Sequence, residues 1–463
     1  MKKYIINTAK LFLAISIAFP MNVFAQEEKK DEKKQEDFKY GTPNFFRPYD
    51  QTGIGVFEIS KKDWNKKYDG MKIRFGAGFT QQFQGIKHEN PTAINNTGTG
   101  ANRLWKLTPG FMTAQANLYI DAQLGDGIAL NVTNYMSARH HNEFWVKGGY
   151  IKFDKLPFKG EFWTNLMKIT TIKVGHYEIN YGDAHFRRPD GGGTIQAPFM
   201  EANVMDAFAT EIGGEIMIQK NGLFGMFGIT NGMIKGNVDS TFKTAQDDNT
   251  KKNPSFLFKG GYDKQLTDKV RVRVSGSLYT NSSQAGSGLT LYSGDRTGSN
   301  YQNVMEVERK ADGTVKSYTD MMSSGRFNPG FSKKITAIMF NGFLKAYGFE
   351  FFGTYETAKG RSKTETIERT AKQYAVEGIY RFGKDENLYL GARYNNVKSE
   401  MLYSGAIQNV SINRTAFAAG WFVTKNVLMK AEIVNQKYLD FPGVDYRSGG
   451  KFNGYVIEAV VGF

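Results

Sequence analysis

Histidines are the side chains in this 463-residue sequence that are best suited to acid–base or metal chemistry. The five histidines are His88, His140, His141, His176 and His185. The run HHNE at 140–143 lacks the HExxH spacing of a zinc-binding helix, and no serine occupies a GxSxG elbow. A histidine near a carboxylate in a loop is more often an ordinary polar contact than a catalytic dyad. The sequence therefore predicts no enzyme and no catalytic residue.

Phosphate and metal sites have no better support in the sequence. The triplet Gly191 to Gly193 is not followed by the Lys-Ser/Thr pair with which a P-loop holds phosphate and magnesium. Asp247, Asp248 and Asn249 lack the spacing of a calcium loop, and a solvated acidic turn is the better interpretation. The absence of cysteine excludes thiolate metal sites, disulfides and a lipid-anchored N-terminus. We expect neither a cofactor nor a bound metal.

The first 25 residues are typical of a secretory signal peptide. Lys2, Lys3 and Lys10 precede an apolar run at 11–19 that is too short to span a bilayer. The segment Val23-Phe24-Ala25 places small residues at the minus-three and minus-one positions of a cleavage site, so we expect cleavage after Ala25. A retained helical anchor is the less favoured alternative. No later apolar stretch has the length of a transmembrane helix.

Apolar and polar residues alternate with a period of two over residues 71–463. In the first such segment Ile73 and Phe75 fall on one face, and Lys72 and Arg74 fall on the other. Successive side chains of a strand point to opposite faces, so one face meets lipid and the other meets water. Short connections alternate with long ones. We therefore predict an all-β fold, a transmembrane antiparallel β-barrel of about sixteen strands with short periplasmic turns and long extracellular loops. A soluble β-sandwich or solenoid is the alternative, but no repeat of fixed period supports it.

The charged side chains of these strands are predicted to line the barrel interior. A charged group on the lipid face near mid-membrane costs roughly 2–4 kcal/mol, which favours the inward face. The predicted pore-wall residues are Lys72, Arg74, Arg271, Arg273, Arg393, Glu211, Glu215 and Glu350. Valines alternate with Arg271 and Arg273, which places these two arginines on the polar face of their strand. Basic and acidic candidates are about equally numerous, so a simple anion funnel does not follow.

Residues 26–70 separate the signal peptide from the predicted barrel. The run QEEKKDEKKQED at 26–37 is too charged to bury a core, and we interpret it as a disordered linker. Residues 38–69 are aromatic and turn-rich. The sequence leaves three alternatives open for them: they pack against the periplasmic mouth, they enter the barrel, or they dock loosely outside it. The net charge of +15 falls to about +12 once the signal peptide is removed. Because the chain is exported, we expect outer-membrane lipid, lipopolysaccharide and small solutes as partners, and no nucleic acid.

The last strand ends the chain on an aromatic residue. Tyr455 and Phe463 share the apolar face of the terminal segment GYVIEAVVGF. This ending resembles the C-terminal signal by which bacterial outer-membrane barrels are recognised by the barrel-assembly machinery. A terminal strand of a soluble sheet is the alternative interpretation.

Taken together, residues 71–463 resemble Gram-negative outer-membrane porins, in length and style those of Bacteroidota-type bacteria related to phosphate-selective porins. The resemblance rests on the strand pattern, phrases such as FVTKNVLMKAE and the terminal phenylalanine. It implies an outer-membrane channel for passive diffusion of small hydrophilic solutes and ions, anionic solutes included. It also implies a homotrimer. A non-conducting barrel that binds a partner or serves secretion or assembly is the alternative, and the connection 281–333 is long enough to bind one.

The resemblance also assigns a role to the segment YGDAHFRRPDGGGTIQAPFMEANVMD at 181–206. In porins the loop after the fifth strand folds into the lumen and narrows it. The candidate constriction residues are Tyr181, Asp183, His185, Arg187, Arg188, Asp190 and Glu201. Glycines permit the tight backbone of an inward loop, and opposed charges in a narrow passage act strongly on ions. A surface loop with solvated charges is the alternative.

Overall fold

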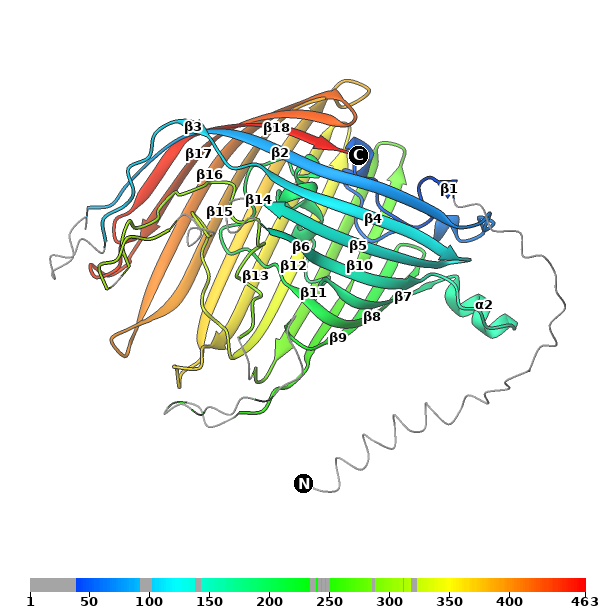
Figure 1. The fold of residues 1–463 in the computed structure, drawn as a ribbon, viewed down its shortest axis with the longest axis horizontal. Coiled ribbons are helices and arrows are strands. Elements are labelled where there is room, and N and C mark those ends of the chain that lie inside the picture. Colours follow the sequence, from blue (N-terminus) through cyan, green and yellow to red (C-terminus); the bar gives the residue numbers. More distant parts are fainter. Residues whose placement is uncertain are drawn as a thin grey trace. The chain divides into compact units, whose positions relative to one another are not determined.

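Sixteen antiparallel strands close into a barrel in the computed structural model. The structure describes residues 39–91, 102–137, 143–233, 239, 243, 246, 250–284, 288–310, 312–317 and 323–463. Each barrel strand pairs with its neighbours in chain order, and the last strand returns to pair with the first (Figure 1). The predicted fold class is confirmed. The proposed signal peptide and linker, the pair His140 and His141, and the acidic run at 247–249 lie outside the described residues.

The barrel strands are β2 (Lys72–Glu89), β4 (Gln115–Gly125), β5 (Ile128–Ser137), β6 (Glu143–Phe153), β7 (Thr170–Glu178), β8 (Thr210–Lys220), β9 (Leu223–Thr230), β10 (Ser255–Thr267), β11 (Val270–Asn281), β12 (Lys334–Ala346), β13 (Phe349–Arg361), β14 (Arg369–Phe382), β15 (Leu388–Tyr403), β16 (Ala406–Thr424), β17 (Val427–Leu439) and β18 (Lys451–Gly462). The shorter elements are β1 (Lys39–Tyr40), η1 (Gln51–Gly53), η2 (Lys61–Asp63), β3 (Gly110–Phe111), α2 (Glu161–Met167), η3 (Ala184–Arg187) and η4 (Gly191–Gln196). Among the described residues, none of the helices has the length and apolar character that crossing a membrane requires.

The period-two pattern places apolar side chains outside the barrel and polar ones inside it. On β11, Val274 is 59% exposed on the outer face, whereas the adjacent Arg273 is 2% exposed and points inward. On β2, Phe75 is exposed on the outer face and Arg74 donates to Asp121 inside the barrel. Because the alternation is set by strand geometry, the faces follow from the sequence alone.

Connections at one end of the barrel are tight turns. Asn221 and Gly222 both have positive φ (53° and 89°) between β8 and β9, as a two-residue type I′ hairpin requires. The connection between β6 and β7 is longer and contains the short helix α2. At the same end, the chain terminus closes the barrel, since the Phe463 backbone exchanges hydrogen bonds of 2.9 and 3.0 Å with Ala77. Tyr455 and Phe463 are exposed on the outer face, and their role in assembly stays a prediction.

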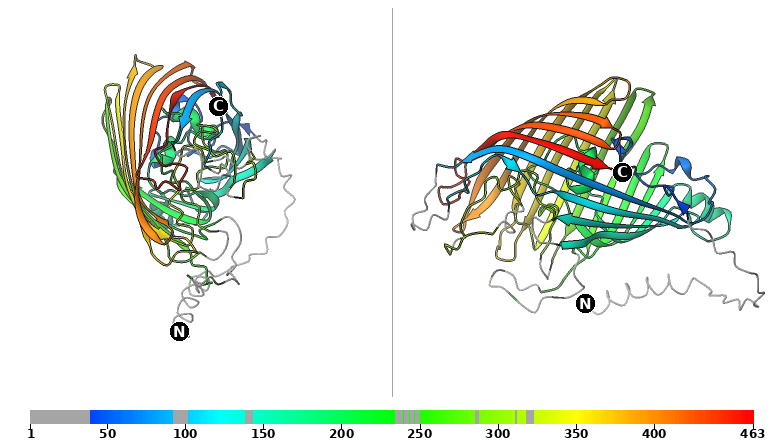
Figure 2. Two further views of the ribbon diagram at one scale, coloured as in Figure 1. Left: turned by 90° about the vertical axis from the view of Figure 1, so that its left-hand side faces the viewer. Right: turned by 45° about the horizontal axis from the view of Figure 1, so that its top comes forward.

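The barrel interior is occupied by chain that is not part of the wall. Three segments lie there: the N-terminal segment (42–64), the first inward segment (181–206) and the described parts of the second inward segment (288–333). Figure 2, left, looks into the ring of strands and shows helical turns and loops inside it. The site is therefore built from wall strands on the outside and these segments on the inside.

Candidate functional site in the barrel lumen

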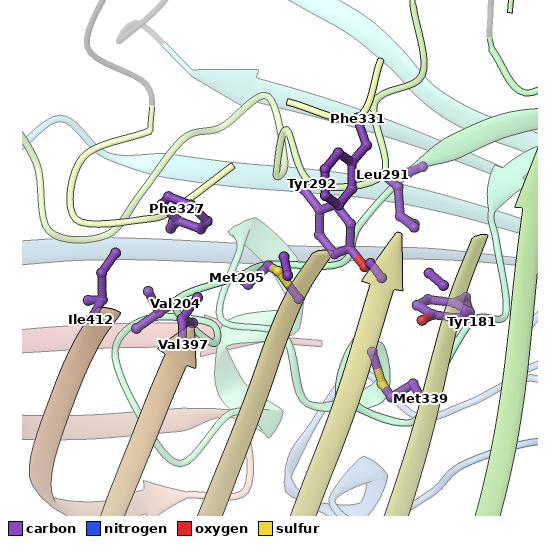
Figure 3. Packing of buried hydrophobic residues seen from close by; sticks show 14 of the residues in the cluster. Tyr181, Val204, Met205, Leu291, Tyr292, Phe327, Phe331, Met339, Val397 and Ile412 are labelled. Carbon is purple, nitrogen blue, oxygen red and sulfur yellow. The ribbon is translucent and has the colours of Figure 1, made fainter. Parts of the chain in front are cut away.

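The two inward segments pack against the wall through a hydrophobic core inside the barrel. Figure 3 shows side chains of the segments facing the inner side chains of β12, β15 and β16. The segment residues labelled there are Tyr181, Val204, Met205, Leu291, Tyr292, Phe327 and Phe331, and the wall residues are Met339, Val397 and Ile412. Val204 has no exposed surface, and Phe327 is 1% exposed. The alternative of a partner-binding barrel rested on the length of the connection 281–333, and most of the described apolar side chains of this connection are buried in the internal core.

Asp183 anchors the first inward segment to the wall strands β10 and β11. Its carboxylate accepts hydrogen bonds from Arg273 (2.7 and 2.8 Å) and Ser275 (2.7 Å) and forms an ion pair with Lys259 (2.8 Å). Its backbone N–H donates to the Asn341 side chain at 2.8 Å. The Glu58 carboxylate of the N-terminal segment lies 2.7 Å from Arg273. Burying these charges together satisfies them mutually, whereas each alone would carry a large desolvation cost.

Arg187 anchors the same segment to β13 and β14. Its guanidinium lies 2.6 Å from Glu350 and 3.2 Å from Glu377. Arg381 and Arg393 pair with these same two carboxylates from the wall side, at 2.9 and 2.8 Å. Alternating cations and anions thus join the segment to the wall, and all four carboxylate–guanidinium contacts are buried.

Arg188 and Asp190 connect the first inward segment to the second inward segment and to β6. Arg188 binds Asp190 (2.7 Å) and also Asp206, and Asp190 pairs with Lys147 at 2.5 Å. Lys147 also pairs with Asp295 of the second inward segment at 2.8 Å. Lys147 has no partner residue in β5, because the pairing shifts from Thr133–Gly148 to Asn134–Val146, and this bulge is compatible with its inward direction.

Three further candidate constriction residues are also held inside the barrel. The Tyr181 hydroxyl donates to Glu356 at 3.1 Å, as does Tyr292 of the second inward segment at 2.6 Å. The Glu201 carboxylate pairs with Arg326 at 2.9 Å. His185 Nε2 hydrogen-bonds Asn180 Oδ1 at 2.9 Å. The structure thus brings all seven candidates of 181–206 into the barrel interior, and their role as a constriction stays a prediction.

The remaining predicted pore-wall residues also point inward, and each has a polar partner. Lys72 pairs with Asp69 and Arg74 with Asp121, at 2.8 and 2.6 Å. Arg271 pairs with Asp263 and Glu215 with Lys173, both at 2.7 Å. Glu211 accepts from the Tyr279 hydroxyl at 2.8 Å. The described residues contain no cluster of three His, Asp or Glu side chains that could hold a metal ion.

The N-terminal segment enters the lumen, which was one of three alternatives left open by the sequence. The Tyr49 hydroxyl donates to Asp121 at 2.8 Å, and Gln196 of the first inward segment donates to the Pro48 carbonyl at 2.7 Å. Lys61 pairs with Asp154 at 2.9 Å. Phe57 is 2% exposed and packs against Phe343 of β12. The segment is therefore an integral part of the lumen rather than a loosely docked extension.

A cavity of about 370 Å³, here called the chamber, lies between the N-terminal segment, the first inward segment and the inner faces of β4 to β8. Its aromatic lining includes Phe45, Phe46, Tyr49, Tyr119, Tyr150 and Tyr177. Its charged lining comprises the cations Arg47, Lys147, Lys152, Lys173 and Arg188 and the anions Glu58, Asp154, Glu178, Asp190 and Glu215. The chamber is thus mixed in charge, and sequence reasoning missed Arg47, Glu58 and Lys147. The run FFRPY at 45–49 was the available signal, because an aromatic and basic segment suits a polar, aromatic-lined interior.

Docking of the first inward segment is expected to survive mild acid. Burial raises the pKa of Asp183, but Lys259 and Arg273 outweigh it and hold that pKa below its usual range. Burial also raises the pKa of Asp190, but the adjacent Lys147 and Arg188 outweigh burial and hold that pKa below its usual range. A depressed carboxyl pKa gives stability that is present above the unfolded value of about 3.9 and is lost only as pH falls through the folded value. Amide hydrogen exchange over 181–206 should therefore be equally slow at about pH 7 and about pH 5 once corrected for intrinsic rates. Faster corrected exchange at the lower pH would contradict this prediction.

Comparison with known proteins identifies a fold but no family. No protein-family model and no curated protein matches the sequence. The outer-membrane channel DcaP of Acinetobacter baumannii aligns with a TM-score of 0.50 at 9% identity, over 86% of this chain and 99% of that chain. OmpT of Vibrio cholerae aligns with a TM-score of 0.47 at 9% identity, over 86% and 99% of the two chains. An anion-selective porin from Comamonas acidovorans aligns with a TM-score of 0.47 at 10% identity, over 85% and 100%. At this identity the likeness concerns the fold alone, and the DcaP alignment carries it: the chain has the fold of an outer-membrane β-barrel.

Proposed function

We propose that this protein is a porin-like outer-membrane channel for small hydrophilic solutes, with its path on the side of the lumen bounded by β4 to β8. The observation that carries the proposal is the chamber: a charged and aromatic cavity of about 370 Å³ inside a closed barrel. The opposite side of the lumen is filled by the internal core and the buried ion pairs of the inward segments. A solute path then follows the side that is left unfilled.

The rest of the proposal concerns how the channel reaches its place. The chain is exported through a signal peptide of 25 residues that is then cleaved. Its C-terminal strand, with Tyr455 and Phe463 on the outer face, is read by the barrel-assembly machinery of a Gram-negative bacterium. The exposed apolar face then meets outer-membrane lipid and lipopolysaccharide, and the barrel assembles as a homotrimer. The alternative is a barrel that does not conduct and binds a partner instead.

Single-channel recording in a planar bilayer tests this function. The refolded mature chain is expected to give stable conductance steps, and the reversal potential under a salt gradient reports which ion sign is preferred. Heat-modifiable migration in gel electrophoresis confirms separately that the barrel has folded. A folded barrel that gives no steps, both as the full chain and without its N-terminal segment, would sink the channel proposal and favour a partner-binding role.

Replacing Asp190 with Asn is expected to shift the reversal potential toward anions. The change removes one of the negative charges of the chamber and leaves Lys147 and Arg188 with less compensation. Charges in a narrow, partly desolvated passage act strongly on ions, so the shift should be measurable in bilayer recordings. Asp126→Asn is the matched control, because Asp126 is 54% exposed in the turn between β4 and β5. Equal reversal potentials for the two variants would remove 181–206 from the ion path.

A further inference from the structure

Most charged side chains of the chamber are paired within the protein. The ion pairs are Lys173–Glu215 at 2.7 Å, Lys152–Asp154 at 3.4 Å, Lys147–Asp190 at 2.5 Å and Arg188–Asp190 at 2.7 Å. Glu58 is paired as well, with Lys259 and Arg273. Two charged residues of the lining, Arg47 and Glu178, do not follow this rule.

Arg47 has no acidic partner among the residues that the structure describes. Its Nε and Nη2 atoms both donate to the Gly53 carbonyl, at 3.1 and 2.9 Å. Within the described part of the chain, no carboxylate oxygen comes within 4.0 Å of its guanidinium nitrogens. The Nε–Nη2 edge of this guanidinium is therefore used by Gly53, and the Nη1–Nη2 edge is the one left for bidentate binding of a carboxylate.

Glu178 lacks a basic partner of the lysine or arginine type among the described residues. Its Oε1 atom is buried without a hydrogen-bond partner, and its nearest basic group is His185 Nδ1 at 3.9 Å. Burial and the adjacent Lys259 lower the pKa of His185 well below its usual value, so this ring is neutral near pH 7. Its Nε2–H donates to Asn180, which leaves a lone pair on Nδ1 toward the carboxylate. His185 therefore provides no positive charge for Glu178.

The two residues before Glu178, His176 and Tyr177, also carry buried polar atoms that form no hydrogen bond with described residues. These atoms are His176 Nε2 and the Tyr177 hydroxyl, and all three residues line the chamber. Buried polar atoms are nearly always hydrogen-bonded in folded proteins, so each exception requires an explanation. The three residues lie at the end of β7 and line the chamber, so a molecule bound there can supply hydrogen bonds to these atoms.

We propose that the chamber binds a small zwitterion, a free amino acid with an apolar or aromatic side chain. Its carboxylate would occupy the Nη1–Nη2 edge of Arg47, and its ammonium group would pair with Glu178 and stabilise the charged form of that carboxyl group, which burial alone disfavours. Tyr150 and Tyr177, whose rings lie 6.2 Å apart in an edge-to-face arrangement, provide apolar surface for the side chain. A volume of about 370 Å³ is near the lower limit of ligand-binding cavities, which suits a molecule of this size. The inference rests on the proposed function, since the bound solute is the one that the channel would select.

Three probes that differ by one charged group test this assignment. Phenylalanine carries both charges, 3-phenylpropionate lacks the ammonium group, and phenethylamine lacks the carboxylate. Calorimetric titration of the full mature chain in detergent is expected to show phenylalanine binding about tenfold or more tightly than either analogue, since a charge-assisted hydrogen bond in a desolvated site is worth at least that factor.

Variants assign each charge to its residue. Arg47→Gln should lower the affinity for phenylalanine and leave the affinity for phenethylamine unchanged. Glu178→Gln should lower the affinity for phenylalanine and leave the affinity for 3-phenylpropionate unchanged. Asp126→Asn, outside the chamber, should leave all three affinities unchanged. Equal affinity for phenylalanine and 3-phenylpropionate would overturn the proposal in favour of a simple anion site, and no binding of any probe would overturn the site altogether. Conductance of the same preparation separates the two proposals: steps without binding leave the channel standing, and binding without steps leaves the site standing.

Discussion

Removal of residues 42–64 is expected to raise the single-channel conductance several-fold. These residues occupy the lumen through Tyr49, Phe57 and Lys61, and they form one wall of the chamber. Ionic conductance increases with the open cross-section of a pore, and this deletion removes one wall of the chamber and so enlarges the open lumen. The strands do not depend on the segment for their backbone pairing, because β2 pairs with β4 and β18 along its length. The barrel should therefore still fold and migrate as a heat-modifiable species.

A point variant separates undocking of the segment from its deletion. Lys61→Ala removes the buried ion pair with Asp154, in which both side chains are less than a tenth exposed. The segment should then leave the lumen intermittently, and recordings should show flickering between two conductance levels. Lys66→Ala is the control, because the Lys66–Asp63 pair is more than half exposed on both sides and such pairs contribute little. Identical conductance in the deletion variant and the full chain would show that the segment lies outside the ion path.

The barrel was predictable because strand alternation is a local property of the sequence. Successive side chains of a strand point to opposite faces. The alternation of valine and arginine in the sequence therefore places Val272 and Val274 on the outer face and Arg271 and Arg273 on the inner face. The strand number follows from counting such segments. The tight turns follow from pairs such as Asn221 and Gly222, whose residue types favour positive φ.

The filling of the lumen was not predictable, because it depends on contacts between distant residues. Asp183 binds Arg273 and Asn341, which are 90 and 158 residues away in the chain. Nothing local marks Glu58 as the second acceptor of Arg273. The sequence around Leu291 and Tyr292 has no periodic pattern that would distinguish a loop folded into the barrel from a loop that extends into solvent. The candidate residues of 181–206 were identified by their charges, but their partners required the three-dimensional arrangement.

Replacing Asp183 with Asn is expected to release the first inward segment from the wall. The carboxylate is 1% exposed and pairs with both Lys259 and Arg273. Glu58 still pairs with both cations in the variant, so the cluster loses one of its buried negative charges and keeps one positive charge without compensation. Removing one partner of a buried ion pair typically costs roughly 3–5 kcal/mol, because an uncompensated buried charge remains. The strand ladders are not touched, so the loss should be local: amide hydrogen exchange over 181–206 should accelerate while exchange in β10 and β11 stays slow. Slow exchange over 181–206 in the variant would contradict the anchoring role of Asp183.

A second substitution shows whether the uncompensated charge is the cause. Lys259→Gln in the Asp183→Asn background removes the excess positive charge and keeps hydrogen-bonding groups at both positions. If the cost arises from an unpaired buried charge, the double variant should exchange more slowly over 181–206 than Asp183→Asn alone, although it has lost one more native contact. Asp63→Asn, in an exposed pair, should leave exchange at its original rate. If exchange over 181–206 is faster in the double variant than in Asp183→Asn alone, the protection lost at the two positions adds up. Hydrogen-bond geometry around Asp183, rather than charge balance, then holds the segment inside the barrel.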